Sequence, residues 1–170
     1  QMAPRPDSDY TSRFGRYILA VSSIDPRKNF KQIIAAFQAL DIPHINLVIA
    51  GGTNKLFAHT RLDEAIKGNP RIHLTGRVTD RQLTALYAAA AAFVYPSLYE
   101  GFGLPPLEAM ACGCPCVVAD TASLPEVCGD AVLYCNPSDT DSIVKQVRRL
   151  LTDDKLVDQL RQKGMARKFN

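Results

Sequence analysis

Two kinds of apolar pattern alternate along the chain. Short continuous apolar runs are typical of strands buried on both faces of a sheet, and apolar residues that recur every three or four positions are typical of amphipathic helices. The pattern predicts strands at residues 17–22, 46–50, 72–75, 92–95, 116–119 and 131–135. It predicts helices at residues 30–40, within 55–67, from 79 to about 90, and at 105–111, 139–151 and 153–168. Strands that alternate with helices indicate βαβ units, and therefore a parallel sheet covered on both faces.

Helix-end signals support these assignments. Thr79 and Gln82 have the spacing of a capping box, in which two side chains satisfy free N–H groups at a helix start. Gly113 follows the helix at 105–111 as a C-terminal stop. Ser123 and Glu126 repeat the capping-box spacing, which favours a structural role for Glu126 over a functional one.

We therefore expect an α/β fold, a Rossmann-like doubly wound sheet of parallel strands in the order 3-2-1-4-5-6. In that order the first and fourth strands are neighbours, and ligands bind in the crevice at their carboxyl ends. Residues 22–28 begin where the first strand ends, and residues 96–108 follow the fourth strand. These two segments should meet at the crevice, although they are distant in the sequence.

Composition limits the class of protein. A chain of 170 residues with 46% hydrophobic residues is long enough for one domain with a real core. Residues 1–14 have the character of a leader or linker, so we expect the domain at residues 15–170. The 20 basic and 17 acidic residues are mixed along the chain, so nucleic acid is not an expected partner. The longest apolar stretch, residues 83–95, is too short to cross a bilayer.

The residue types that bind metals are not spaced as metal ligands. The 5 cysteines lack a zinc or redox spacing, so we expect buried reduced thiols, as in a reducing cytosol. His44, His59 and His73 are scattered along the chain. The sequence therefore predicts no metal centre.

The most informative segment is a glycine-bearing bend between the fourth strand and the next helix. The bend consists of Gly101, Phe102, Gly103 and Leu104. Pro105 and Pro106 follow in the first helical turn, where the missing proline N–H is not needed. The free N–H groups and the positive end of the helix dipole suit a phosphate group. The alternative is a strand-to-helix turn that binds no ligand.

Two glutamates flank this bend. Glu108 lies about one turn into the helix, where it can accept hydrogen bonds from the two hydroxyls of a ribose or can interact with the helix dipole. Glu100 precedes the glycines, where it can hold a sugar hydroxyl or stabilise positive charge at an oxocarbenium-like carbon. The alternative for Glu100 is a solvated loop carboxylate. A phosphate site between two carboxylates suits a nucleotide sugar.

Basic residues come from the other segment at the crevice. Arg27 and Lys28 precede the first long helix, where positive charge opposes the helix dipole and predicts a compensating anion. A diphosphate leaving group fits that requirement, and ordinary surface exposure is the alternative. Val78 follows the third strand, where its backbone can meet a nucleobase.

These motifs together resemble the C-terminal domain of the retaining glycosyltransferases of GT-B fold often called family 4. The matching stretches are VSSIDPRKNF, LVIAGG and the run from IHLTGRV to LYCNP, and EGFGLPPLEAMACG is the most specific of them. The resemblance implies that Glu100 and Lys28 are catalytic. It implies that the donor is bound by Glu108, Gly101, Phe102, Gly103, Leu104, Arg27, Ser22 and Val78. Many members have Gly-Arg where this chain has Ser22 and Ser23, so Arg27 is the candidate substitute for that arginine.

The resemblance also implies a function. We expect the donor-binding half of a retaining hexosyltransferase, a mannosyltransferase that uses GDP-mannose and needs no metal or other cofactor. The acceptor, a glycan or a lipid-linked sugar, is expected on an N-terminal domain absent from this chain, so the chain alone should bind donor weakly and catalyse nothing. We expect the full-length enzyme in the cytoplasm, with peripheral association at the inner face of the membrane.

Three other functions remain open. The first is a glucosyltransferase that uses UDP-glucose. The second is a non-transferring sugar-nucleotide enzyme on the same fold. The third is a dinucleotide-binding module, but the chain lacks a G-x-G-x-x-G fingerprint after the first strand.

Overall fold

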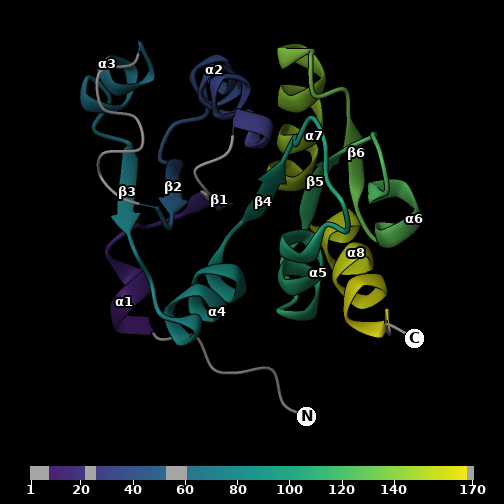
Figure 1. The fold of residues 1–170 in the computed structure, drawn as a ribbon. Coiled ribbons are helices and arrows are strands. Elements are labelled where there is room, and N and C mark those ends of the chain that lie inside the picture. Colours follow the sequence, from purple (N-terminus) through teal and green to yellow (C-terminus); the bar gives the residue numbers. More distant parts are fainter. Residues whose placement is uncertain (1–7, 22–25, 53–60, 168–170) are drawn as a thin grey trace.

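A six-stranded parallel sheet, in the order β3-β2-β1-β4-β5-β6, forms the centre of the molecule (Figure 1). The computed structural model describes residues 8–21, 26–52 and 61–167. The strands are β1 (Tyr17–Val21), β2 (Asn46–Ala50), β3 (Ile72–Gly76), β4 (Ala92–Tyr95), β5 (Cys116–Ala119) and β6 (Leu133–Cys135). The predicted strand order is confirmed. The sixth strand begins two residues later than the sequence predicted.

Helices cover both faces of the sheet. They are α1 (Ser8–Ser12), α2 (Phe30–Leu40), α3 (Arg61–Lys67), α4 (Asp80–Ala89), α5 (Leu104–Ala111), α6 (Leu124–Cys128), α7 (Thr140–Thr152) and α8 (Asp154–Ala166), with a 3-10 turn, η1, at Pro26–Lys28. The predicted capping box of Thr79 and Gln82 is confirmed at the start of α4. Part of the expected leader is ordered, because α1 packs against α4 and Phe14 is buried.

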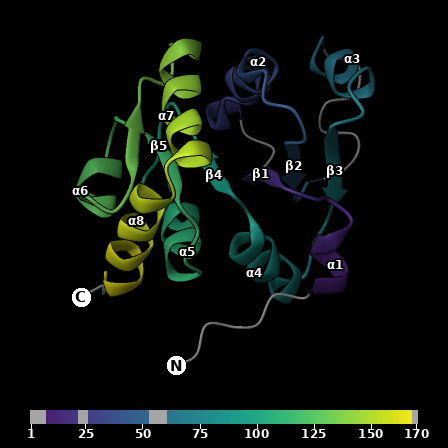
Figure 2. The ribbon, with the colours of Figure 1, turned by 180° about the vertical axis from the view of Figure 1, so that it is seen from behind.

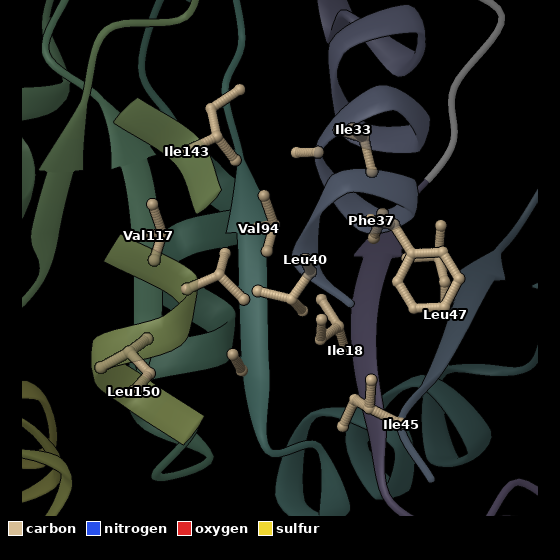
Figure 3. Packing of buried hydrophobic residues seen from close by; sticks show 14 of the residues in the cluster. Ile18, Ile33, Phe37, Leu40, Ile45, Leu47, Val94, Val117, Ile143 and Leu150 are labelled. Atoms are coloured by element: carbon tan, nitrogen blue, oxygen red, sulfur yellow. The ribbon is translucent and has the colours of Figure 1, made fainter. Parts of the chain in front are cut away.

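Alternating side chains divide the core into two layers, as the two-residue period of a strand requires. Ile18 and Val94 face the layer of α2 and α7, whereas Leu19 and Phe93 face the layer of α4 and α5. Figure 3 shows Leu40 of α2 between β1 and β4 in the first layer. Because both faces of the central strands are buried, only the ends of the strands are open to ligands.

The C-terminal helix ties the second half of the sheet together. Figure 2 shows α8 beside α5, and Gly164 approaches Met110 so closely that an added Cβ would lie 3.2 Å from the Met110 Cβ. Arg167 then reaches α6, where its Nε and Nη2 donate to the carbonyl oxygens of Val127 (2.6 Å) and Glu126 (3.0 Å). This contact fixes the C-terminal end of α6.

Candidate functional site

The carboxyl ends of β1 and β4 are adjacent, and the two segments that follow these strands meet there. β1 pairs directly with β4 through Ile18 and Leu19. The η1 turn continues from β1, and the segment from Pro96 to the start of α5 continues from β4. The backbone N–H of Leu98 donates to the carbonyl of Arg27 over 2.8 Å, so the two segments are joined through the main chain.

An ion pair lies at this junction. Lys28 Nζ is 2.6 Å from Glu100 Oε1, although the two residues are 72 positions apart. Their side chains are only 13% and 15% exposed. Lys28 also donates a hydrogen bond to the hydroxyl oxygen of Tyr95 at the end of β4. The anion that the position of Lys28 predicts is therefore present in the protein itself, as Glu100.

Burial and hydrogen bonding oppose each other at Glu100. Burial acts to raise the pKa of the carboxyl, but hydrogen bonds from Lys28, Tyr95 and Ser97 outweigh it and hold the pKa below its usual value. Burial raises the pKa of Tyr95, as does its hydrogen bond with Glu100. At neutral pH Glu100 is therefore an ionised carboxylate beside the protonated phenol of Tyr95. Glu100 is not a solvated loop residue.

Two buried polar residues hold the junction in place, and the sequence analysis did not identify either. Ser97 is fully buried, and its hydroxyl lies 2.7 Å from Glu100 Oε1 and 3.1 Å from the Arg27 carbonyl. Asn29 has a left-handed backbone (φ 64) and caps no helix N–H with its side chain. Its Nδ2 instead donates to the carbonyls of Pro96 (2.9 Å) and Pro137 (2.7 Å). Asparagine tolerates a positive φ better than most residues, so the residue type at position 29 was the sequence signal for this backbone conformation.

The glycine bend lies between this pair and α5. Gly103 has φ 78 and is the N-cap residue of α5, which begins one residue earlier than predicted, at Leu104. A Cβ on Gly103 would be 2.7 Å from Cδ2 of the buried Leu124, whereas a Cβ on Gly101 would meet nothing within 4 Å. The two glycines therefore have different reasons to be glycine. Gly103 fits against the protein, and Gly101 leaves open space at the surface.

Ser123 contacts the bend from the side of α6, and this corrects a prediction. The expected capping box with Glu126 is wrong, because the Ser123 side chain makes no cap hydrogen bond. Its hydroxyl donates instead to the carbonyls of Glu100 (3.2 Å) and Gly101 (3.1 Å). The hydroxyl is turned toward the nearby carbonyls of the bend, and its oxygen therefore does not accept a hydrogen bond from a backbone N–H of α6.

The other predicted site residues are less enclosed. Glu108 is exposed on α5, and no described side chain forms an ion pair with it. Arg27 is exposed, with its guanidinium 6.0 Å from the ring centroid of Tyr99. Val78 is half-buried between β3 and α4. Ser22 lies outside the described residues.

Large apolar side chains surround the charged pair at the surface. Leu98, Tyr99, Phe102 and Leu104 are 49%, 59%, 56% and 58% exposed. They share the segment that carries Glu100 and the glycines. The site therefore offers apolar contact area beside a buried charge pair and a helix N-terminus.

The described residues outside this site show no disulfide, no metal-ligand cluster and no membrane-spanning helix. All five cysteines are free, and burial raises the pKa of Cys128 to about 11 and of Cys135 to about 12. Across the described ranges, no three His, Cys, Asp or Glu side chains gather as metal ligands. In the same ranges, no helix has both the length and the apolar character needed to cross a membrane.

Known proteins match the chain in sequence. The model of the family "Glycosyl transferases group 1" matches residues 14–167. The O-antigen chain mannosyltransferase B of Escherichia coli is 39% identical over 156 residues, which is 88% of this chain and 40% of that protein. The O-antigen chain mannosyltransferase RfbU of Salmonella typhimurium is 31% identical over 137 residues, which is 79% of this chain and 39% of that protein. The chain thus spans about two fifths of the length of these curated relatives.

Solved structures match the fold. Sucrose-phosphate synthase from Thermosynechococcus elongatus has a TM-score of 0.76 at 27% identity, over 94% of this chain and 43% of that one. Anabaena Alr3699/HepE in complex with UDP and glucose has a TM-score of 0.81 at 19% identity, over 95% of this chain and 47% of that one. The second likeness shows the fold alone.

The ion pair makes stability depend on pH in a defined direction. Because the folded pKa of Glu100 is lowered, its stabilisation is present above the ordinary carboxyl value of about 4.3 and is lost as pH falls through the lowered value. We expect Glu100→Gln to lower the free energy of unfolding by about 1–3 kcal/mol at pH 7. Urea denaturation should show this difference in the free energy of unfolding becoming smaller as the pH falls below about 4.3. Glu126→Gln, at an exposed glutamate, is the control, and a gap that stays constant for Glu100→Gln contradicts the ion pair.

The two glycines of the bend should respond differently to one added methyl group. Gly103→Ala forces alanine into a left-handed conformation, at a cost of about 1–2 kcal/mol, and also crowds Leu124. Gly101→Ala meets open space and should change the free energy of unfolding by less than about 0.5 kcal/mol. Urea denaturation of both variants measures the difference, and equal losses would contradict this account of the bend.

Proposed function

Because the chain belongs to the group 1 glycosyl transferases, we propose that it is the donor-binding part of a retaining hexosyltransferase, with GDP-mannose as the donor. The observation that carries this proposal is the contact of Lys28 with Glu100 beside the glycine bend. The donor has anionic phosphates in its middle and hydroxyl groups at both ends. The site has a cation paired with one carboxylate, Glu100, beside a helix N-terminus, and a second carboxylate, Glu108, lies about one turn into that helix.

The diphosphate binds between Lys28 and the N-terminus of α5. A lysine ammonium has three N–H donors, and two of those on Lys28 go to Glu100 and Tyr95. No other acceptor among the described residues takes the third, and we assign it to a phosphate oxygen. The open space at Gly101 lets the diphosphate approach the backbone closely. The positive end of the α5 dipole adds favourable charge, and Leu104 supplies the N–H at this helix start because Pro105 and Pro106 have none.

The two carboxylates bind the two ends of the donor. Glu108 lies four residues beyond Leu104, about 6 Å along the helix axis, and is exposed. It accepts hydrogen bonds from the ribose hydroxyls. Glu100, fixed by Ser97 and Lys28, faces the transferred sugar, where its negative charge stabilises the oxocarbenium-like carbon. The backbone of Val78 contacts the base, and Arg27 adds positive charge at the phosphates.

The reaction is a transfer on one face of the sugar. The bond between the anomeric carbon and the β-phosphate oxygen breaks, and the acceptor oxygen bonds to the anomeric carbon from the same side. The acceptor proton passes to the departing phosphate oxygen, so the atoms and charges balance. Lys28 stabilises the negative charge that develops on the leaving group.

Mannose is the proposed sugar because several relatives at 31–39% identity are named mannosyltransferases. The names of two of these include the O-antigen chain, which supports a glycan or lipid-linked acceptor. Since this chain covers about 40% of such a relative, the acceptor is proposed to bind a part of the protein beyond this domain. The working site of the whole enzyme is proposed to be the cytoplasm, at the inner face of the membrane.

Ligand binding tests the ribose contact. In isothermal titration calorimetry we expect GDP and GDP-mannose to bind the chain more tightly than UDP-glucose, and NAD not to bind. Glu108→Ala should weaken GDP about tenfold to a hundredfold, which corresponds to about 1.5–3 kcal/mol for a hydrogen bond to a charged group. Glu126→Ala, at an exposed glutamate on α6, is the matched control.

The same titration with 2′-deoxy-GDP locates the effect. The wild-type chain should prefer GDP, and Glu108→Ala should bind the two ligands equally. If the variant keeps the full preference for GDP, Glu108 does not contact the ribose.

The proposed site uses no metal ion. A lysine and a helix N-terminus supply the positive charge that the diphosphate requires. GDP affinity should therefore change less than about twofold when EDTA is added and when Mg²⁺ is restored. Loss of binding on chelation, with recovery on addition of Mg²⁺, would contradict this part of the proposal.

A further inference from the structure

The hydroxyl of Ser123 does not serve the helix that it precedes. Ser123 is the N-cap residue of α6, where serine ordinarily accepts a hydrogen bond from a backbone N–H of the first turn. Here it caps nothing and donates to the carbonyl oxygens of Glu100 (3.2 Å) and Gly101 (3.1 Å). The side chain that precedes α6 therefore contacts two successive peptide groups at the glycine bend, with its one hydrogen shared between their carbonyls.

The orientation of these carbonyls fixes the orientation of two N–H groups. The described chain has no cis peptide bonds, and in a trans peptide the C=O and the following N–H point in opposite directions. The carbonyls of Glu100 and Gly101 belong to the peptides whose N–H groups are on Gly101 and Phe102. Since both carbonyls point toward Ser123, both N–H groups point away from α6.

These two N–H groups are available to a ligand. Within the described residues, no backbone carbonyl accepts a hydrogen bond from the N–H of Gly101 or Phe102. Both residues are exposed, and the space beside the Gly101 Cα is open. A pair of successive N–H groups beside the start of α5 and the Lys28–Glu100 pair forms an anion-binding surface.

The segment around Ser123 is rigid enough to hold the bend. Thr121 donates from Oγ1 to the Ser97 carbonyl over 3.3 Å. Leu124 is fully buried and packs against the Cα of Gly103. The other end of α6 is held by Arg167. The segment around Ser123 thus contacts the bend directly through Ser123 and Leu124, while Thr121 and Arg167 hold this segment at its two ends.

We propose that Ser123 is a positioning residue for the diphosphate: it turns the peptides of the glycine bend so that the N–H groups of Gly101 and Phe102 face the phosphates. This inference rests on the proposed function. Without the hydroxyl, each peptide is free to rotate and to present a carbonyl oxygen to the ligand. A partial negative charge then replaces a donor, and phosphate is bound less well.

Ser123→Ala and Ser123→Thr test the proposal, with GDP and guanosine as the two ligands in calorimetry. We expect Ser123→Ala to weaken GDP at least tenfold and to leave guanosine within twofold, because guanosine has no phosphate. Ser123→Thr keeps the hydroxyl and should restore most of the GDP affinity. Thr152→Ala removes a comparable hydroxyl-to-carbonyl hydrogen bond at the end of α7 and should have no effect on either ligand.

A second measurement tests the proposal even if Ser123→Ala lowers the stability of the protein. Addition of inorganic pyrophosphate should shift the amide resonances of Gly101 and Phe102 in the ¹H–¹⁵N spectrum of the wild-type chain and of Ser123→Thr, and much less in Ser123→Ala. An equal weakening of GDP and guanosine, or unchanged GDP affinity in Ser123→Ala, overturns the role of Ser123 alone. If the wild-type chain binds neither GDP nor UDP, the proposed function fails and the inference fails with it.

Discussion

The site depends on one ion pair, which lies largely shielded from solvent where the segments after β1 and β4 meet. Lys28 and Glu100 come from segments 72 residues apart, and each side chain is at most 15% exposed. A half-buried charge is tolerated only with a partner and with further hydrogen bonds, and Ser97 and Tyr95 supply these. The junction therefore joins the two halves of the sheet at the point where strand order reverses.

This pair also determines the charge that the site presents to an anion. The positive charge of Lys28 is already matched by Glu100, so the ammonium is neither isolated nor repelled by the start of α2. In the proposed complex, a diphosphate would share the ammonium with the carboxylate instead of meeting a bare cation. Tyr99, Phe102 and Leu104 are exposed large side chains on the segment that carries Glu100, and in that complex they would exclude water from around the shared charge.

Much of the fold could be predicted from the sequence because its signals are local. Continuous apolar runs identify strands such as β2 and β4, and Thr79 with Gln82 identifies the start of α4. The strand order was predictable because six strands that alternate with helices favour the doubly wound arrangement. The candidate site was predictable only in part. The topology brings Lys28 near Glu100, but nothing local indicates that Ser97 bridges them or that Asn29 spans two distant carbonyls.

The error at Ser123 has the same physical origin. Serine before a short helix is typical of an N-cap, and the sequence alone shows only the backbone N–H groups of that helix as hydrogen-bond partners. In the folded chain two carbonyls of a distant loop lie within reach of the hydroxyl. The direction in which a serine hydroxyl points is therefore poorly predicted wherever long-range carbonyls lie within its reach, because a hydroxyl turned toward them no longer faces the N–H groups of the adjacent helix.

The hydrogen bonds from Arg167 to α6 have a practical consequence for the choice of a C-terminal truncation. Its guanidinium closes the carbonyl end of a helix that precedes it by about forty positions. A truncation just after Ala166 keeps every turn of α8 but removes the Arg167 hydrogen bonds to α6. Domain boundaries chosen from secondary structure alone would thus cut one residue too early and release the C-terminal end of the neighbouring α6.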